Sequence, residues 1–146
     1  MIRKANKFDK EDVISMLRLF RDESPFVNYK QLENVTYISG LIDKIIAGMG
    51  VIYIKPNQGI IIGIIQPTIW SDKMYVMHEL VWFVKKEFRK TSVGYRLLKE
   101  YIDYAKALKE KNSISFYTIT KMVTSPDVKY EKFGFSKIEE NWISND

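Results

Sequence analysis

Apolar positions along the chain either recur every three or four residues or form continuous segments, and these two patterns predict helices and strands. A three- or four-residue spacing runs from Asp9 to Phe20 and predicts a first helix. A second helix is predicted within Tyr29 to Ala47, most securely from Ser39 to Ala47. The same spacing returns from Ser92 to Lys111 and predicts a long helix whose inward face is apolar: Leu97, Leu98, Tyr101, Ile102, Ala105 and Leu108.

Continuous apolar segments between these helices predict strands. Val51–Lys55 and Gln58–Trp70 flank the turn pair Pro56-Asn57, so we expect a hairpin. The second of these strands is apolar at nearly every position, which is typical of a strand covered on both faces. Ser71 to Lys73 reads as a turn, and Met74 to Val84 as the third strand.

The rest of the chain completes an α/β layout with a mixed sheet flanked by helices. We expect a strand from Ser113 to Thr118, a short helix from Ser125 to Phe135 and a last strand from Ser136 to Ile143. A short first strand at Ile2 to Lys7 is also compatible with the sequence. Hairpin-linked strands come first, and one strand–helix–strand crossover follows them.

Length and composition narrow the classes of protein. The 146 residues suit one domain over the whole chain, 1–146. The lack of cysteine excludes disulfides, zinc–thiolate sites and cysteine nucleophiles, and it fits a reducing cytoplasm, that of the host if the gene belongs to a phage. The basic N-terminus is not followed by an apolar stretch, and the aliphatic stretch Ile60–Ile65 is too short to span a bilayer, so we expect no membrane partner.

The net charge of +5 suits a polyanionic partner. No basic run exceeds three residues, which disfavours nucleic acid relative to a phosphorylated small molecule. The strongest local signal lies where the apolar strand ending at Val84 turns, through small residues, into the helix from Ser92. A helix N-terminus exposes free N–H groups and the positive end of the helix dipole, and Arg89 and Lys90 add charge. This junction is therefore a candidate phosphate site.

Two segments of this chain resemble the GCN5-related N-acetyltransferase (GNAT) superfamily. The first, Arg89-Lys90-Thr91-Ser92-Val93-Gly94, is similar to the family's pyrophosphate motif, although Ser92 stands where glycine is usual. The second, Tyr130-Glu131-Lys132-Phe133-Gly134-Phe135, is similar to its C-terminal signature. Val123 stands where many members carry an asparagine that helps to hold the cofactor, so that contact is not carried over.

The resemblance implies a splayed central sheet and acetyl-CoA, or a close acyl-CoA, as co-substrate, with no metal. The pantetheine arm would pair with the strand edge at Trp82 to Val84, and a backbone N–H near Phe83 or Val84 would polarise the thioester carbonyl. Tyr130 would be the general acid. The diphosphate would lie against the loop that runs into the helix: Arg89, Lys90, Thr91, Ser92, Val93, Gly94 and Tyr95.

The base stays open between two neighbours and a water chain. His78 is the only histidine, and the unperturbed pKa of a histidine side chain lies near neutrality. Counting back from Arg89, His78 falls where well-studied members keep a catalytic glutamate, and Glu79 follows it. Successive strand side chains face opposite ways, so one of the two at most points into a cleft, and a bulge would exchange them.

Three functions follow from the sequence. The first is direct transfer of an acetyl group from acetyl-CoA to a primary amine on a small molecule or a protein. The second is a degenerate GNAT-fold module that binds acyl-CoA or a protein without catalysis, and the third is a basic nucleic-acid-binding domain. The segments Phe20–Gly40 and Ile119–Asp127 would select the acceptor, and a homodimer is compatible with the resemblance.

Overall fold

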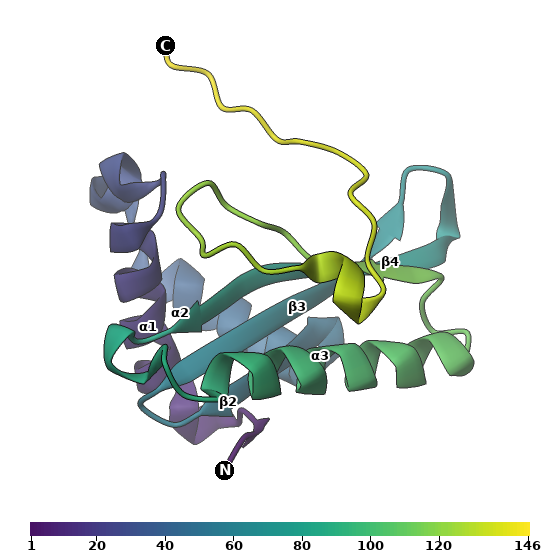
Figure 1. The fold of residues 1–146 in the computed structure, drawn as a ribbon, viewed down its shortest axis with the longest axis horizontal. Helices are drawn as coiled ribbons and strands as arrows, with labels where there is room; N and C mark the ends of the chain where they lie inside the picture. The colour runs from purple at the N-terminus through teal and green to yellow at the C-terminus, as the bar shows by residue number, and fades with distance from the viewer.

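The computed structural model describes all 146 residues and contains a five-stranded mixed sheet with helices on both faces, which confirms the predicted fold class (Figure 1). The strands lie in the order β1-β2-β3-β4-β5; neighbouring strands are antiparallel except β4 and β5, which are parallel. The strands are β1 (Arg3–Lys4), β2 (Gly50–Lys55), β3 (Gly59–Thr68), β4 (Ser71–Val84) and β5 (Phe116–Thr118). The helices are α1 (Lys10–Glu23), α2 (Val35–Lys44) and α3 (Val93–Glu110), with a π-helical turn at Ile45–Met49 and 3-10 turns at Lys7–Asp9, Val27–Leu32, Lys86–Phe88 and Tyr130–Phe133.

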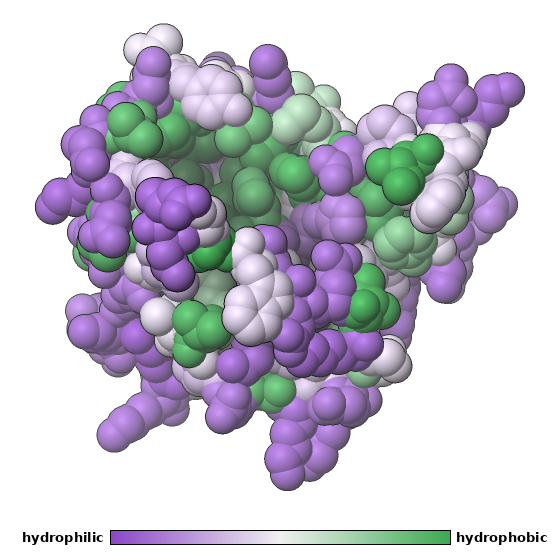
Figure 2. Space-filling view, turned by 90° about the horizontal axis from the view of Figure 1, so that it is seen from above, coloured by the Kyte–Doolittle hydropathy of each residue, from purple (hydrophilic) through white to green (hydrophobic).

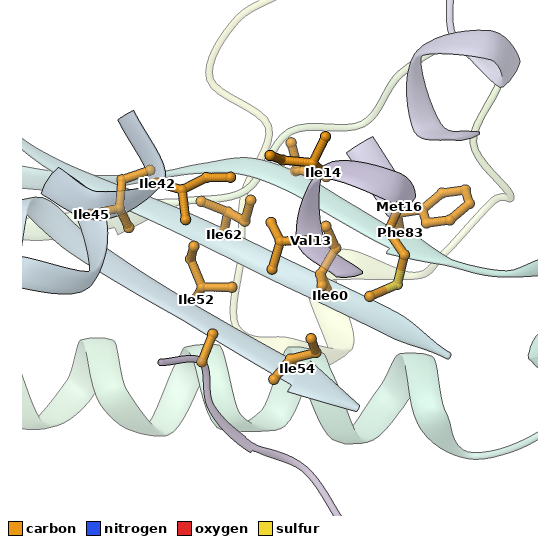
Figure 3. Packing of buried hydrophobic residues seen from close by; sticks show 12 residues of the cluster. Val13, Ile14, Met16, Ile42, Ile45, Ile52, Ile54, Ile60, Ile62 and Phe83 are labelled. Carbon is orange, nitrogen blue, oxygen red and sulfur yellow. The ribbon is translucent and has the colours of Figure 1, made fainter. Parts of the chain in front are cut away.

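The sheet separates two hydrophobic cores. Helices α1 and α2 pack on one face, where Figure 3 shows isoleucines of β2 and β3 meeting Val13 and Ile42. Helix α3 packs on the other face. Alternation along β3 serves both cores, since Ile60 and Ile62 belong to the first and Ile61 to the second. The expectation that this strand is covered on both faces is confirmed.

The predicted helices form with small changes at their ends. Helix α1 runs three residues beyond Phe20, and the Ser24 N–H then donates to the Arg21 carbonyl. The side chain of Asn34 accepts a hydrogen bond from the Tyr37 N–H at 3.0 Å and so caps the start of α2. Helix α3 buries the predicted apolar face, with Leu108 partly buried against it.

The turn predicted at Ser71–Lys73 is wrong. The chain reverses at Ile69 and Trp70, and β4 already begins at Ser71. This end of the hairpin protrudes beyond the rest of the sheet (Figure 1), and Asp72 and Lys73 are exposed there. Polar residues at the solvated end of a strand have the composition of a turn, which explains the error.

The C-terminal predictions are only partly right. The helix expected from Ser125 shrinks to the 3-10 turn Tyr130–Phe133, which Gly134 ends with a φ of 89°. The strand expected at Ser136–Ile143 does not form, and residues 136–146 make no hydrogen bond to the rest of the chain, from which they extend away (Figure 1). Its apolar residues do not alternate regularly, and β5 offers only three residues for pairing, because the strand expected from Ser113 begins at Phe116.

The sheet opens between β4 and β5. The parallel pairing covers Val76, Met77 and His78 on β4, and it ends where the chain leaves β5 after Thr118. From Glu79 to Val84, β4 has β3 on one side and no strand on the other. The family resemblance implied such a splay, and the candidate functional site lies along it.

Candidate active site

A β-bulge at Leu80 reverses which side chains of β4 face each core. Gly63 lies opposite Glu79 and Ile62 opposite Val81, so Leu80 is the extra residue. Before the bulge, Met77 packs in the α3 core. After it, Val81 packs in the α1/α2 core instead, although both residues have odd numbers.

The half of β4 that has no strand on its second side, Glu79–Val84, forms one wall of a cleft of about 350 Å³. The end of α1, the start of α3 and the segment from Thr120 to Tyr130 supply the other walls. Figure 2 shows this face of the molecule hollowed, with hydrophobic side chains lining the hollow and hydrophilic ones around its rim. The predicted site residues that line the cleft are Glu79, Phe83, Val84, Arg89, Thr91, Gly94, Tyr95 and Tyr130.

Glu79 is the buried acid of the cleft. Its residue is 7% exposed, and its carboxylate accepts one hydrogen bond, from the Thr120 N–H at 3.3 Å. Burial raises the pKa of Glu79 to about 7, and the Thr120 N–H opposes this shift only in part. A carboxyl group with such a pKa exchanges protons readily near neutral pH.

His78 lies on the other face of β4 and does not line the cleft. It is paired with Ile64, which packs against the α1/α2 core. Its Nδ1 is 2.6 Å from Thr118 Oγ1, and the two atoms share a hydrogen bond. Of the two candidate bases, the structure therefore brings only Glu79 into the cleft with Tyr130.

Tyr130 begins the 3-10 turn Tyr130–Phe133, from which Tyr130 and Phe133 line the cleft. The Phe135 N–H donates to its carbonyl at 3.2 Å, and Phe135 in turn packs edge-on against Tyr117 of β5. Burial raises the pKa of Tyr130, with smaller contributions from the charges of Glu79 and Asp127. Its phenol therefore stays protonated at neutral pH and keeps a proton to donate.

The junction between β4 and α3 presents free backbone donors. The N–H groups of Lys90, Ser92, Gly94 and Tyr95 donate to no atom of the protein, and the first turn of α3 contains no acidic side chain. Ser92 has φ −80° and ψ 1°, a conformation open to any residue, so the loop does not need the glycine that is usual in the family. The side chains of Lys90 and Ser92 are exposed outside the cleft, and Val93 packs in the core.

Gly94 leaves space between α3 and β4 that no side chain of the protein fills. A Cβ added there would meet Val84 Cγ2 at 3.5 Å and Trp82 Cζ2 at 3.9 Å, which are ordinary contacts. Neither packing nor a positive φ therefore requires glycine at this position. The missing side chain keeps the space between α3 and β4 open.

Arg89 is already engaged by the protein. Its Nε donates to the Val84 carbonyl at 2.8 Å, and its guanidinium lies 5.5 Å from the centre of the Phe83 ring. It also forms an ion pair with Glu23 at the end of α1. A phosphate at the loop would compete with Glu23 for this charge, whereas Lys90 has no ion-pair partner.

A comparison with known protein families identifies the family of this chain. A family model described as an acetyltransferase (GNAT) domain matches residues 26–146. The chain belongs to the GNAT acetyltransferase family. No curated protein matches the sequence significantly.

Solved structures share the fold of this GNAT domain at low sequence identity. A Trypanosoma brucei acetyltransferase is 16% identical with a TM-score of 0.70, covering 99% of this chain and 98% of the other. Glucosamine-6-phosphate N-acetyltransferase from Arabidopsis thaliana is 18% identical with a TM-score of 0.68, covering 99% and 96%. A predicted acetyltransferase from Clostridium acetobutylicum, solved with acetyl-CoA, is 16% identical with a TM-score of 0.67, covering 100% and 95%.

GNAT acetyltransferases use acetyl-CoA, and the free edge of β4 fits an extended ligand of this kind. The Lys85 N–H donates to the Gln58 carbonyl, so the backbone of Lys85 faces β3. Alternation then directs the N–H groups of Trp82 and Val84 to the free edge and that of Phe83 to β3. The indole Nε1 of Trp82 is buried and has no hydrogen-bond partner.

Several residues of the site were not predictable from the sequence. Thr120 acts through its backbone N–H, which carries no sequence signal. Glu23 lies within the predicted acceptor segment Phe20–Gly40, but no local signal showed that it pairs with Arg89. Val123, the position of the missing asparagine, is 89% exposed and does not line the cleft.

No group of three His, Cys, Asp or Glu side chains is arranged to hold a metal. No helix has both the length and the apolar character of a membrane span.

Proposed function

We propose that this GNAT domain is an N-acetyltransferase that moves an acetyl group from acetyl-CoA to a primary amine by direct transfer in a ternary complex. The observation that carries the proposal is that Glu79 and Tyr130, an acid–base pair with raised pKa values, line the same cleft as Gly94 at the start of α3. Two proton-transfer groups and an anion-binding helix end therefore share one cleft.

The residues around the cleft fit acetyl-CoA. The free N–H groups at Lys90, Ser92, Gly94 and Tyr95 would hold the diphosphate, assisted by the helix dipole and by Lys90. The free edge of β4 at Trp82 and Val84 would hold the pantetheine arm by strand addition. When bound, acetyl-CoA supplies an acetyl group activated as a thioester.

The side chains divide the proton transfers between them. Glu79 accepts the proton that the amine loses as its nitrogen bonds to the acetyl carbon, either directly or through one water. The Trp82 N–H, the free-edge donor nearer Glu79, would stabilise the negative charge that develops on the acetyl oxygen, which leaves the Val84 N–H to the pantetheine arm. Tyr130 donates its proton to the sulfur as the carbon–sulfur bond breaks.

The acceptor would approach between α1 and the segment after β5. Phe20, Glu23 and Ser24 line the cleft on one side, and the residues on the other side are Met122, Thr124, Ser125, Pro126 and Val128. The Glu23 carboxylate is held by Arg89, so Glu79 is the one cleft carboxylate without a cationic partner. This arrangement favours an acceptor with one amine over a polyamine.

Two measurements test the proposal. Calorimetry with acetyl-CoA should detect binding, and release of free thiol with a panel of amines should detect transfer. Binding without thiol release across the panel would instead support a non-catalytic acyl-CoA-binding module. Absence of binding at millimolar acetyl-CoA would overturn both functions.

A further inference from the structure

The point where β5 leaves β4 is held by side chains in addition to the strand pairing. Only three residue pairs join the strands, with one more hydrogen bond from the Ser115 N–H to the Tyr75 carbonyl at 2.8 Å. The last pair is His78 with Thr118. Such a short parallel pairing is weak by itself, so additional contacts matter at its end.

Thr118 is bound on two sides. His78 Nδ1 shares a hydrogen bond with its Oγ1 at 2.6 Å, on the face of β4 away from the cleft. The hydroxyl of Tyr101, which is completely buried on α3, donates to its carbonyl at 2.6 Å. Both the side chain and the main chain of Thr118 are therefore fixed.

Two residues later, the Thr120 N–H donates to Glu79 Oε1 at 3.3 Å. This is the only hydrogen bond that the buried carboxylate accepts from the protein. The direction of the chain after Thr118 decides whether this N–H reaches Glu79. Two hydrogen bonds, joined by the backbone from Thr118 to Thr120, thus connect His78, which is outside the cleft, to the carboxylate inside it.

We propose that His78 is a positioning residue: through Thr118 it fixes where β5 leaves β4 and keeps the Thr120 N–H on the Glu79 carboxylate. The inference rests on the proposed function for its catalytic meaning, but the two hydrogen bonds themselves do not. It gives His78 a role other than that of the base.

The surroundings of Glu79 simplify the test. Tyr101 on α3 and Tyr130 in the 3-10 turn contribute phenols whose pKa values are raised by burial, so neither is charged near neutrality. Gly63 of β3 contributes no side chain. Glu23 and Arg89 line the same cleft and form an ion pair with each other. The Thr120 N–H is therefore the main group that favours the ionised form of Glu79.

The experiment is a pH titration of the Thr120 amide by ¹H–¹⁵N NMR on the protein alone. In the unmodified chain the resonance should follow Glu79, with a midpoint near its pKa of about 7. Thr118→Val and His78→Leu should each raise this midpoint by about half a pH unit, because the carboxylate loses its donor. The acid limb of kcat/KM for acetyl transfer should move in the same direction.

Three variants serve as controls. Thr118→Ser keeps the hydroxyl, and His78→Asn offers an amide group close to the position of Nδ1, so both should keep the original midpoint. Thr36→Val makes the same change at an exposed position of α2 and should also leave it unchanged. If His78→Leu does not fold, the comparison of Thr118→Val with Thr118→Ser is sufficient for the test.

Three results would overturn the inference: a Thr120 amide that does not titrate, an original midpoint in folded Thr118→Val, or equal shifts in Thr118→Ser and Thr118→Val. Loss of the acid limb of kcat/KM in His78→Asn would make His78 itself the base. Because the NMR titration needs neither acetyl-CoA nor an amine, it remains decisive if the protein transfers no acetyl group.

Discussion

The two halves of β4 differ in their strand pairing and in what they contribute to the protein. From Val76 to His78 the strand has β3 on one side and β5 on the other, and Met77 is completely buried. From Glu79 to Val84 it has β3 alone, and a cleft lies along it. The first half contributes hydrophobic packing, whereas the second presents free backbone groups, a buried carboxyl group and a bulge.

This difference shows how one strand can combine stability with chemistry. A backbone N–H without a partner and a buried carboxylate both cost free energy of folding. The paired half and the two cores offset that cost. We therefore expect truncation of packing side chains in the paired half, such as Met77, to act mainly on stability, and substitutions along the open half to act on ligand binding or catalysis as well. His78, the last residue of the paired half, acts on the site through Thr118.

Glu79→Gln should have the largest effect. Loss of the base should lower kcat by about 10³-fold at neutral pH and remove the titration near pH 7 from the rate profile, measured by thiol release. The same change in the exposed Glu110 should leave the rate unaltered. A Glu79→Gln protein with at least half of the original rate would eliminate Glu79 as the base.

The same variant should be more stable than the original chain at high pH. The pKa of Glu79 is raised from 4.5 when unfolded to about 7 when folded, so the folded state binds more protons between these values. Stability therefore falls as pH rises from 4.5 to 7, by on the order of 3 kcal/mol in total. Denaturant unfolding of both proteins at pH 5 and pH 8 should show the gap only at pH 8.

Met77→Ala tests the paired half and should act on stability. Truncating this fully buried side chain, which lies beside Gly63, should cost about 3 kcal/mol in denaturant unfolding. Acetyl-CoA affinity of the folded protein should stay within about twofold of the original. Met49→Ala is the matched control, since Met49 is 37% exposed. A large loss of affinity in folded Met77→Ala would show that the two halves are not separable.

The sequence predicted the elements in which a regular pattern coincides with burial. The apolar face of α3 recurs every three or four residues and is buried on one side, whereas the isoleucines of β3 form a continuous apolar segment that is buried on both faces. The junction at Ser92 was also predictable, because small residues between a strand and a helix have a direct physical meaning. Prediction failed at Ser71–Lys73 and Ser136–Ile143. These segments show little hydrophobic periodicity, so only their composition could guide the prediction.

The site itself was predictable only up to the choice between neighbours. The sequence left His78 and Glu79 open because strand alternation does not show where a bulge lies. The register around Leu80 puts Glu79, and not His78, in the cleft. The partners Thr120 and Glu23 depend on how distant segments meet, which no local pattern contains.

Tyr130→Phe tests the proposed general acid, which lines the cleft beside the open half of β4. Removing the phenolic proton donor should lower kcat by about 10²-fold, because the sulfur then leaves without its proton. Cofactor affinity by calorimetry should change by less than about twofold, since the ring is retained. Tyr37→Phe, at a position 67% exposed, is the control. An equal fall in kcat and affinity would mean that Tyr130 binds the cofactor and does not act as an acid.

Gly94→Ala should have the smallest effect, yet it separates ligand from protein most cleanly. The new methyl group would make only ordinary contacts with Val84 and Trp82, so unfolding experiments should show unchanged or slightly higher stability. In the cofactor-bound state the same methyl group would occupy ligand space, and we expect affinity for acetyl-CoA to fall about tenfold, or about 1.4 kcal/mol.

Gly40→Ala is the matched control, because an added Cβ there meets nothing within 4 Å on α2. It should raise stability by about 0.5–1 kcal/mol through helix propensity and leave acetyl-CoA affinity unchanged. Unchanged affinity in Gly94→Ala as well would mean that the ligand does not approach the start of α3. Glycine at position 94 would then have no role that either the fold or the cofactor explains, and the open half of β4 would have to bind acetyl-CoA without the helix end.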